Sequence, residues 1–476
     1  MTIRAVRMKC FAVCDDRIEG RLDSEFYLPE FLELEDKLKR LDYLRLGDIA
    51  NFSNETWNQQ SIYDKEFPYI EIGEIDTSTG EIKNIIYYGL EDAPSRAKMV
   101  VKENDIIIST TRPDRGAISI IDKAKDNFIA STGFAILREI KSKNVNREYL
   151  FYILRTRLCL SQMRQRSGGG NYPAIVTEEL KKIVIPIPHN TTQTYVVKTM
   201  KSAYEHKKQK DEEARKLLES INGFVLEHLG ISLPEINDKS CFVVWSDDIK
   251  GRKINPQAYT AKPEAIRSAI EGSTYPIRRL SDIVTQNISG DWGEDPVLVK
   301  KTDDHVLCRV LRNTDFVNQY NLNFENVAER LINKDKYQKI RLKQGDILIE
   351  KSGGSPTQPV GRVALVENEG EGYAFSNFVQ LLRINDECIP QYLFIFLKAV
   401  YALNYTEFLQ NQTTGIKNLI MSEYLSIPIP IPPLHVQQQM ADTIKSKMLK
   451  AEQLQKDAQE EVKKAKNEVE NLLLGT

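Results

Sequence analysis

Two short stretches of the chain repeat an unusual pattern, "IVIPIPHNTTQ" at residues 183–193 and "IPIPIPPLHVQ" at residues 427–437. Proline has no amide hydrogen, and it biases the preceding residue toward extended backbone. Alternating isoleucine and proline therefore predicts a stiff strand that is unpaired or lies at a sheet edge, and that cannot continue into a helix. Each stretch predicts the end of a globular domain and the start of a long helix.

Apolar or small residues recur at helical spacing after each stretch. In the first segment they are Val196, Met200, Tyr204, Ala214, Leu218, Ile221 and Val225, with polar Lys207 and Asp211 in the stripe and Gly230 as a C-terminal stop. In the second they are Met440, Ile444, Met448, Ala451, Leu454, Ala458, Val462, Ala465, Val469 and Leu472. Neither stripe is wide enough for a helix buried all round, so we expect two helices of about 40 residues, each roughly 60 Å long, to pair antiparallel as a coiled coil.

The rest of the chain is a tandem repeat whose segments keep their order. The matched pairs are "CFAVCDDRIEGRLDSEFY" (10–27) with "CFVVWSDDIKGRKINPQAY" (241–259), "RLGDIA" (45–50) with "RLSDIV" (279–284), "NDIIIS" (104–109) with "GDILIE" (345–350), "FIASTGFAILR" (128–138) with "YAFSNFVQLLR" (373–383), and "EYLFYIL" (148–154) with "QYLFIFL" (391–397). The short apolar runs opened by an acidic turn predict strands.

The predicted fold class is α/β (mixed α+β), with two similar globular domains separated by the two long helices. The predicted segments are 1–189 (N-terminal segment and first globular domain), 190–230 (central helix), 231–432 (linker and second globular domain) and 433–476 (C-terminal helix). We expect the globular domains at opposite ends of the paired helices, at a set distance and related by a pseudo-two-fold axis. A duplication can also give no more than a larger scaffold.

Length and composition limit the class of protein. A chain of 476 residues exceeds the size of one hydrophobic core, and its 41% hydrophobic and 28% charged residues are typical of globular proteins. No apolar run is long enough to span a membrane, and the N-terminus lacks a secretory apolar core, which predicts a cytoplasmic protein. The six cysteines and five histidines lack metal-ligand spacing, so we expect reduced, buried thiols and no metal site. A net charge of −2 argues weakly against a nucleic-acid binder.

Several motifs together resemble the specificity subunits of type I restriction-modification systems. They are "GRLDSEFYLPEF" (20–31) with its echo "GRKINPQAYTAKPE" (251–264), the "GDI" openings, and the Ile-Pro blocks that lead into the glutamine-containing helices "HNTTQTYVVKTM" and "PLHVQQQMADTI". The resemblance covers nearly the whole chain. It implies that each globular domain is a target-recognition domain that reads one half of a bipartite target in double-stranded DNA, while the helices set the unread spacer.

The resemblance also implies the partners of the chain. They are two methyltransferase subunits that dock on the helices, and restriction/translocase subunits that join through the complex. No catalytic residue and no cofactor are expected in this chain, because S-adenosylmethionine would bind the methyltransferase partner, and ATP and Mg the nuclease/translocase partner. Methyltransferase partners could also supply much of the phosphate clamp.

Base edges are read by arginine, lysine, amide and hydroxyl side chains on loops that approach a groove closely, and glycines permit that approach. Two loops in each half have this composition. The candidates in the first half are Thr111, Arg112, Arg115, Arg164, Arg166, Ser167 and Asn171; those in the second half are Lys351, Ser352, Gln358, Arg362, Gln412, Thr413, Thr414, Lys417 and Asn418. Trp57 and Trp292 could wedge at DNA, although core packing is the favoured interpretation.

Two alternatives remain open from the sequence. The first is a nuclease or methyltransferase, since Asp346, Glu350 and Lys351 are similar to a metal-dependent nuclease motif. Glu350 and Lys351 are adjacent, however, and a strand would send them to opposite faces. "SGGGNYP" also lacks the lysine of a phosphate-binding loop and the second proline of the amino-methyltransferase motif. The other alternative is a coiled-coil scaffold that binds only proteins.

Overall fold

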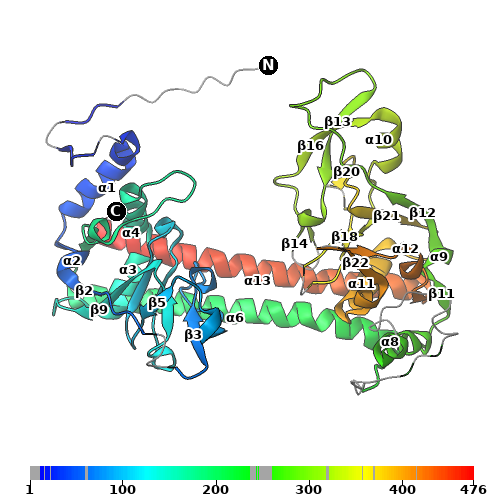
Figure 1. Cartoon of the computed structure of the whole chain (residues 1–476), viewed down its shortest axis with the longest axis horizontal. Coiled ribbons are helices and arrows are strands. Elements are labelled where there is room, and N and C mark those ends of the chain that lie inside the picture. Colours follow the sequence, from blue (N-terminus) through cyan, green and yellow to red (C-terminus); the bar gives the residue numbers. More distant parts are fainter. Residues whose placement is uncertain are drawn as a thin grey trace. The chain divides into compact units, whose positions relative to one another are not determined.

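The computed structural model describes residues 11–14, 17–21, 23–58, 63–235, 243, 245, 260–317, 321–355, 358–367, 370–413 and 415–475 (Figure 1). It divides into two compact units. Unit 1 comprises Met1–Glu212 and Gln453–Thr476, and unit 2 comprises Glu213–Glu452. Both divisions fall inside the long helices α6 (Asn190–His228) and α13 (Leu434–Leu474), so each unit contains part of each helix.

Unit 1 is built on a four-stranded antiparallel sheet with the order β2-β9-β6-β7. A second sheet, β4-β3-β8-β5, contains one parallel pair, β3 with β8. The strands are β1 (Tyr43–Arg45), β2 (Ala50–Ser53), β3 (Glu66–Ile70), β4 (Ile86–Gly89), β5 (Ala97–Val100), β6 (Ile106–Ser109), β7 (Ile118–Ile120), β8 (Ile129–Ser131), β9 (Phe134–Ile140) and β10 (Val184–Pro186). The helices before α6 are α1 (Pro29–Lys39), α2 (Leu46–Ile49), α3 (Arg147–Leu154), α4 (Arg157–Arg166) and α5 (Thr177–Leu180).

Unit 2 repeats this plan, since its four-stranded sheet has the order β12-β21-β17-β19 and its sheet β16-β13-β20 contains one parallel pair, β13 with β20. The strands are β11 (Ile277–Arg279), β12 (Val284–Ser289), β13 (His305–Leu311), β14 (Phe316–Val317), β15 (Asn321–Leu322), β16 (Ala328–Asn333), β17 (Ile347–Glu350), β18 (Ser352–Gly353), β19 (Val363–Leu365), β20 (Ala374–Phe375), β21 (Val379–Ile384), β22 (Gln410–Thr413), β23 (Ile416–Leu419) and β24 (Pro428–Pro430). Its helices before α13 are α8 (Ala261–Glu271), α9 (Leu280–Ile283), α10 (Lys334–Ile340), α11 (Pro390–Ala402) and α12 (Met421–Tyr424). The sequence repeat is thus a repeat of the fold, and the predicted mixed α/β class is confirmed.

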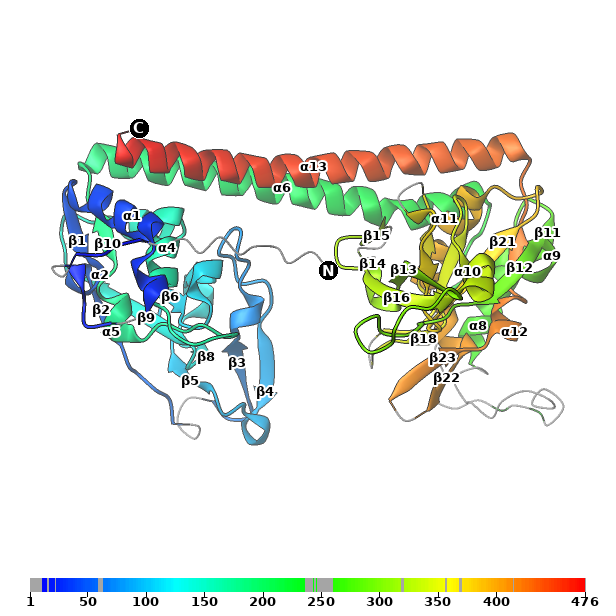
Figure 2. The same cartoon turned by 90° about the horizontal axis from the view of Figure 1, so that it is seen from above.

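The Ile-Pro blocks form short strands of two-stranded sheets. Strand β10 pairs antiparallel with β1, beside which it lies in Figure 2. Strand β24 pairs in the same way with β11. The buried hydroxyl of Tyr149 donates to the carbonyl oxygen of Pro186 at 2.7 Å, and Tyr392 donates to Pro430 at 2.6 Å. Proline carbonyls accept hydrogen bonds although proline amides cannot donate them, so these strands are edge strands held by a tyrosine from α3 or α11.

A buried glutamine in the first turn of each long helix replaces missing backbone partners. The side-chain amide of Gln193 donates to the carbonyl oxygens of Asn144 at 2.7 Å and Pro188 at 3.0 Å, and its oxygen accepts from the N–H of Asn146 at 2.9 Å. Gln437 makes three bonds of the same kind in unit 2. Each glutamine therefore joins the start of its helix to the end of the Ile-Pro block and to the loop before α3 or α11.

The expectation of strands at "RLGDIA" and "RLSDIV" is wrong. Both segments form single-turn helices, α2 and α9, between two strands. The N–H groups of Leu46 and Gly47, at the start of α2, donate to the carbonyl oxygens of Ile183 and Lys181 at 2.9 Å each. Since the free N–H groups at a helix start need acceptors, these carbonyls permit a helix where the local pattern favours a strand.

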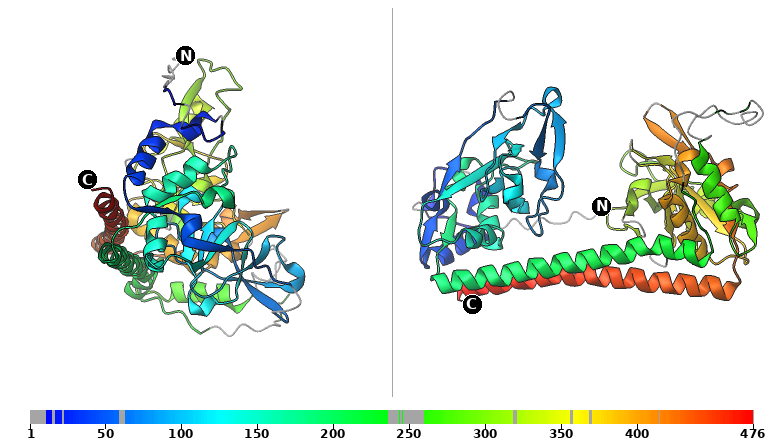
Figure 3. Two further views of the ribbon diagram at one scale, coloured as in Figure 1. Left: turned by 90° about the vertical axis from the view of Figure 1, so that its left-hand side faces the viewer. Right: turned by 90° about the horizontal axis from the view of Figure 1, so that it is seen from below.

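Within unit 1, the start of α6 and the end of α13 run antiparallel (Figure 3). Tyr195 hydrogen-bonds to Glu468, whereas Lys210, four turns later on α6, pairs with Glu461 at 2.7 Å. The stripe residues Val196, Met200 and Val469 are buried together in one hydrophobic cluster. Lys207 is buried in the stripe and pairs with Asp211, the two polar positions that the sequence indicates.

Within unit 2, the end of α6 and the start of α13 are also antiparallel. Lys450 pairs with Glu213 at 3.0 Å, and Lys447 donates to Ser220 at 3.0 Å. The predicted antiparallel pairing is confirmed inside each unit. The predicted distance between the two globular domains and their pseudo-two-fold relation stay predictions.

The predicted face is wrong for one stripe residue, Leu472. Leu472 is 46% exposed, whereas its neighbour Leu473 is 7% exposed and packs in the core of unit 1. An α-helix has 3.6 residues per turn, so after Val469 the buried face returns at the fourth residue instead of the third.

The described cysteines bear out part of the expectation of buried thiols. Cys159 and Cys388 are buried and reduced, and burial raises the pKa of Cys388 to about 12. Cys14 is exposed, so the expectation is wrong there. Cys10 and Cys241 lie outside the described residues. None of the helices within the described ranges is long and apolar enough to cross a membrane.

Candidate nucleic-acid interface

Two loops of unit 1 lie side by side. Residues 110–116 follow β6, and residues 167–174 follow α4. The backbone N–H of Arg112 donates to the carbonyl oxygen of Pro173 at 2.7 Å, and Thr111 forms a β-bridge to the second loop. We call these two segments the first loop pair. The structure thus joins two segments that the sequence indicated separately.

Arg112 has the most defined geometry in the first loop pair. Its backbone is left-handed, with φ of 47°, a conformation that costs free energy in a residue with a side chain. Its guanidinium donates to the carbonyl oxygen of Asn171 at 2.8 Å and lies 4.5 Å from the ring centroid of Tyr172. Tyr172 is 73% exposed, so the arginine is held at the surface with further N–H donors available.

The other candidates in the first half differ in exposure. Arg115, Arg164 and Asn171 are exposed, whereas Thr111 and Ser167 are partly buried. The hydroxyl of Ser167 donates to a backbone carbonyl of α4 at 2.7 Å. The three exposed side chains are accessible to a macromolecular ligand.

Arg166 lies inside the unit. Its side chain is 5% exposed and forms ion pairs with Glu19 and Glu179 at 3.0 Å each. Burial acts to lower the pKa of Arg166, but the hydrogen bonds to the two carboxylates outweigh burial and raise it. Since its donors are used within the fold, we leave Arg166 out of the proposed interface.

The described residues of 351–362 and 410–419 form an equivalent second loop pair in unit 2. Strand β18 in the first segment pairs with β23 in the second, and β23 also pairs with β22. The hydroxyl of Ser352 donates to the side-chain oxygen of Asn418 at 2.7 Å, across the two segments. Lys351 donates to Ser289 at the end of β12 at 2.7 Å, and burial lowers the pKa of Lys351.

The remaining candidates of the second loop pair are less accessible or lie beyond the description. Gln358 is exposed, while Lys417 is buried and its amine donates to the carbonyl oxygen of Gln358 at 3.3 Å. Gln412 and Thr413 lie in β22, and their side chains are outside what the structure describes. Thr414 lies outside the described residues.

Arg362 forms an ion pair that supports the second loop pair. It binds both oxygens of Glu350, at 2.7 and 2.9 Å, and donates to the backbone carbonyls of Asn313 and Phe316. The hydrogen bond to Glu350 raises the pKa of Arg362. The Glu350 side chain is 1% exposed, so the pair joins β17 to the loop at Arg362.

The carboxylates of the nuclease-like motif are both occupied. Asp346 binds Arg383 at 2.7 and 2.8 Å, as Asp105 binds Arg138 in unit 1, and Glu350 binds Arg362. Among the described residues, no group of three or more His, Cys, Asp or Glu side chains could hold a metal ion. Asp346 and Glu350 therefore take part in ion pairs within unit 2.

The two tryptophans pack within their units. Trp57 is buried, donates from its ring N–H to the carbonyl oxygen of Ala97 at 2.8 Å, and contacts Phe67. Trp292 is partly buried beneath the guanidinium of Arg330, 4.3 Å from the ring centroid. The favoured interpretation, core packing, is confirmed for Trp57.

Two residues near the first loop pair are not among those predicted from the sequence. Tyr172 ends the glycine-rich stretch, and an exposed aromatic beside an arginine is a signal that could have been used. Arg155 is buried and donates to the carbonyl oxygens of Gly116 and Ile118 at 2.9 and 2.7 Å, which fixes the end of the loop after β6. Its signal is a charged residue directly after the apolar "EYLFYIL" segment.

Comparison with known proteins gives one family and several relatives. The family described as "Type I restriction modification DNA specificity domain" matches residues 39–216 and 308–464, which together exceed half of the chain. The Type I restriction enzyme HindI specificity subunit of Haemophilus influenzae is 28% identical over 127 residues, covering 25% of this chain and 28% of that protein. The MjaIX specificity subunit of Methanocaldococcus jannaschii is 24% identical over 182 residues, covering 37% and 40%. The chain thus matches less than half the length of either relative.

Two solved structures of type I specificity subunits match this chain with low sequence identity and low TM-scores. The HsdS subunit from Thermoanaerobacter tengcongensis has 18% identity and a TM-score of 0.36, and the type I S subunit from M. genitalium has 13% identity and a TM-score of 0.41. Each comparison covers 91% of this chain and 95% of the other.

Proposed function

The chain belongs to the family of type I restriction-modification DNA specificity domains, and from this premise we propose that it is the sequence-reading subunit of such a system. In this proposal, unit 1 reads one half of a bipartite DNA target and unit 2 reads the other half. The observation that carries it is the presence of two loop pairs of different sequence at equivalent places on one repeated scaffold.

The equivalent placement follows from the strands. Loop 110–116 leaves β6, and loop 351–362 leaves β17, its counterpart in the order of the sheet. Each loop contacts a segment that follows the apolar helix α3 or α11. A scaffold that keeps its strands and varies its loops suits a protein that holds two different readers in the same way.

The side chains offered by the two loop pairs are suited to different bases. Arg112 presents a planar fork beside Tyr172, and bidentate arginine contacts favour guanine in the major groove. The second loop pair instead has the exposed amide of Gln358, with the partly buried Lys351 and Asn418 beside it. Amides favour adenine, so the proposal includes half-sites of different sequence.

The helices provide the remaining part of the proposal. Stiff paired helices can set an unread spacer, whereas a flexible linker cannot. We further propose that they dock two methyltransferase subunits, through which restriction/translocase subunits join. The chemistry then belongs to those partners, with S-adenosylmethionine on the methyltransferase and ATP and Mg on the translocase, and this chain is non-catalytic. The arginine pairing of Asp346 and Glu350 supports that role.

A selection experiment tests the function. The full chain, purified with its methyltransferase partner, is incubated with a pool of random duplexes, and the retained DNA is sequenced. We expect two short conserved blocks separated by a constant number of unspecified base pairs. Arg112→Gln should relax one block and leave the other unchanged. Retained DNA without any conserved block would reject the proposal, and the absence of retained DNA would favour a scaffold that binds only proteins.

A further inference from the structure

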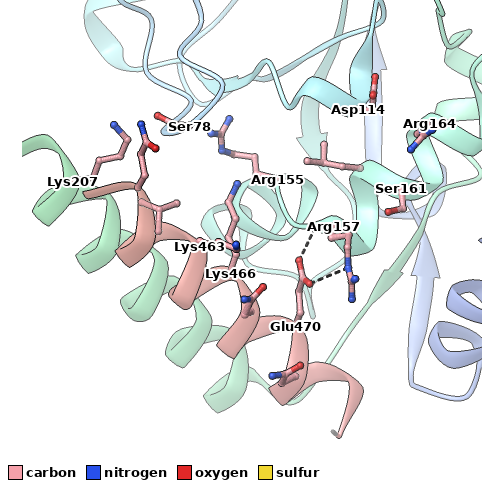
Figure 4. Close-up of a pocket in the computed structure, with 15 residues that line it drawn as sticks. Ser78, Asp114, Arg155, Arg157, Ser161, Arg164, Lys207, Lys463, Lys466 and Glu470 are labelled. Carbon is pink, nitrogen blue, oxygen red and sulfur yellow. Dashed lines mark hydrogen bonds and ion pairs between the residues drawn. The ribbon is translucent and has the colours of Figure 1, made fainter. Parts of the chain in front are cut away.

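A basic cleft of about 750 Å³ lies in unit 1 between α4 and the last turns of α13 (Figure 4). Six cationic side chains line it, from Arg155, Arg157, Arg164, Lys207, Lys463 and Lys466. They face only two carboxylates, of Asp114 and Glu470. The chain as a whole has a net charge of −2, so this concentration of positive charge is local.

The cleft walls are stripes on the two helices. On α4, Arg157, Ser161 and Arg164 lie four and three residues apart, and therefore on one face. On α13, Lys463 and Lys466 lie three residues apart, and Asn467 and Glu470 continue the same face. Two helical faces of this kind can hold an anion between them.

Half of the positive charges already have partners. Glu470 accepts from the backbone N–H of Arg157 at 2.7 Å and forms an ion pair with its guanidinium. Lys207 pairs with Asp211, and Arg155 donates to backbone carbonyls.

The other three charges lack such partners. Within the part of the chain that the structure describes, the side chains of Arg164, Lys463 and Lys466 make no hydrogen bond or ion pair. Lys466 is partly buried, and this burial, together with the nearby charge of Arg155, lowers its pKa to about 8. The carboxylate of Glu470 opposes that lowering only in part, and it also pairs with Arg157, so a bound anion would offset the remaining cost of the partly buried ammonium.

We propose that this basic cleft binds a backbone phosphate of the DNA beside the first half-site, through Arg164, Lys463 and Lys466. The inference rests on the proposed function. It favours DNA over an acidic protein because the cleft adjoins the first loop pair. Helix α4 ends at Arg166, where the loop 167–174 begins, and Asp114 belongs to the loop 110–116. A duplex held by that loop pair would place its phosphates next to the cleft.

The corresponding place in unit 2 has different charges. Aligning Gln193 with Gln437 aligns Glu219 with Lys463 and Asn222 with Lys466. An acid and an amide therefore stand where unit 1 has two lysines. The phosphate contact should then exist on only one side of the bipartite target.

The test compares the double variant Lys463→Gln/Lys466→Gln with the wild-type chain, each purified with the methyltransferase partner. Lys464→Gln is the matched control, since Lys464 is an exposed lysine of α13 outside the cleft. Fluorescence anisotropy measures the affinity for the selected duplex between 50 and 200 mM salt. Each phosphate contact adds about 0.9 to the steepness of the plot of log affinity against log salt. Without that contact, the loss of affinity between 50 and 200 mM salt should be about 3.5-fold smaller.

A second arm identifies the ligand. A neutral methylphosphonate is placed at single phosphates along the selected duplex. We expect one position beside the first half-site to weaken wild-type binding, with no further loss in the double variant and no equivalent beside the second half-site. An unchanged salt slope in the double variant overturns the inference. If that variant also binds the methyltransferase partner more weakly, the ligand of the cleft is an acidic protein surface. Wild-type protein without sequence preference would instead reject the proposed function.

Discussion

Removing Arg362 should destabilise the second loop pair through the carboxylate that it leaves behind. Glu350 is 1% exposed, and Arg362 supplies the two short hydrogen bonds to its oxygens. Breaking a buried ion pair by removing one partner costs about 3–5 kcal/mol. The Arg362 side chain is 25% exposed, so solvent screening places the cost near the lower limit, at about 3 kcal/mol. That corresponds to an increase on the order of a hundredfold in the opening equilibrium.

This loss of stability should come from the unpaired carboxylate of Glu350 and not from the lost packing of the Arg362 side chain. We therefore expect Arg362→Met to cost about 3 kcal/mol, and Glu350→Met/Arg362→Met to cost less than about 1 kcal/mol, because apolar replacement of a whole buried pair is often neutral. Unfolding of a chain with two units is not a two-state process, so the local opening of the unit must be measured. Hydrogen exchange of the β17 and β19 amides reports that opening free energy directly.

The repeat of the fold provides an internal control in unit 1. Ser109 occupies the position of Glu350 in unit 1, so exchange in β6 should be unchanged in both variants. Equal destabilisation by the single and double substitutions would refute the reasoning, because the penalty would then not come from a stranded carboxylate. Binding of the second half-site should weaken with the opening of β17, and that of the first should not.

Three further outcomes are expected. Arg112→Gln should lower the preference for the base that it contacts by about 1–3 kcal/mol, measured by anisotropy with single-base-substituted duplexes, and an equal loss at every base would contradict direct reading. Gln437→Leu leaves three backbone groups without partners and should lower stability by about 2–4 kcal/mol, seen as a lower thermal midpoint of unit 2; a shift within error would contradict its role at the start of the helix. The lowered pKa of Lys466 means that the unfolded chain binds more protons between about pH 8 and 10.5, so this residue makes stability rise with pH in that range. Lys466→Met should lack that component in pH-dependent unfolding, and an unchanged profile would show that the amine is not desolvated.

Local sequence patterns predict the structure correctly where a residue type restricts the backbone in only one way, as proline does. The Ile-Pro blocks form edge strands directly before the long helices, and the apolar stripes of those helices are covered inside each unit. The tandem repeat in the sequence corresponds to the same strand order in the four-stranded sheets β2-β9-β6-β7 and β12-β21-β17-β19. At "RLGDIA", by contrast, the acceptors came from residues 181 and 183, far along the chain, and the local pattern could not show them.

The sequence by itself determined the repeat, the long helices and the segments that form the candidate interface, because hydrophobic spacing and proline chemistry act locally. Only the tertiary structure decided which side chains of those segments remain available. Arg164 and Arg166 are two residues apart on one helix and thus point in different directions; one reaches solvent and the other meets Glu19 and Glu179 from separate segments. Availability depends on burial and on partners distant along the chain, which are properties of the folded unit.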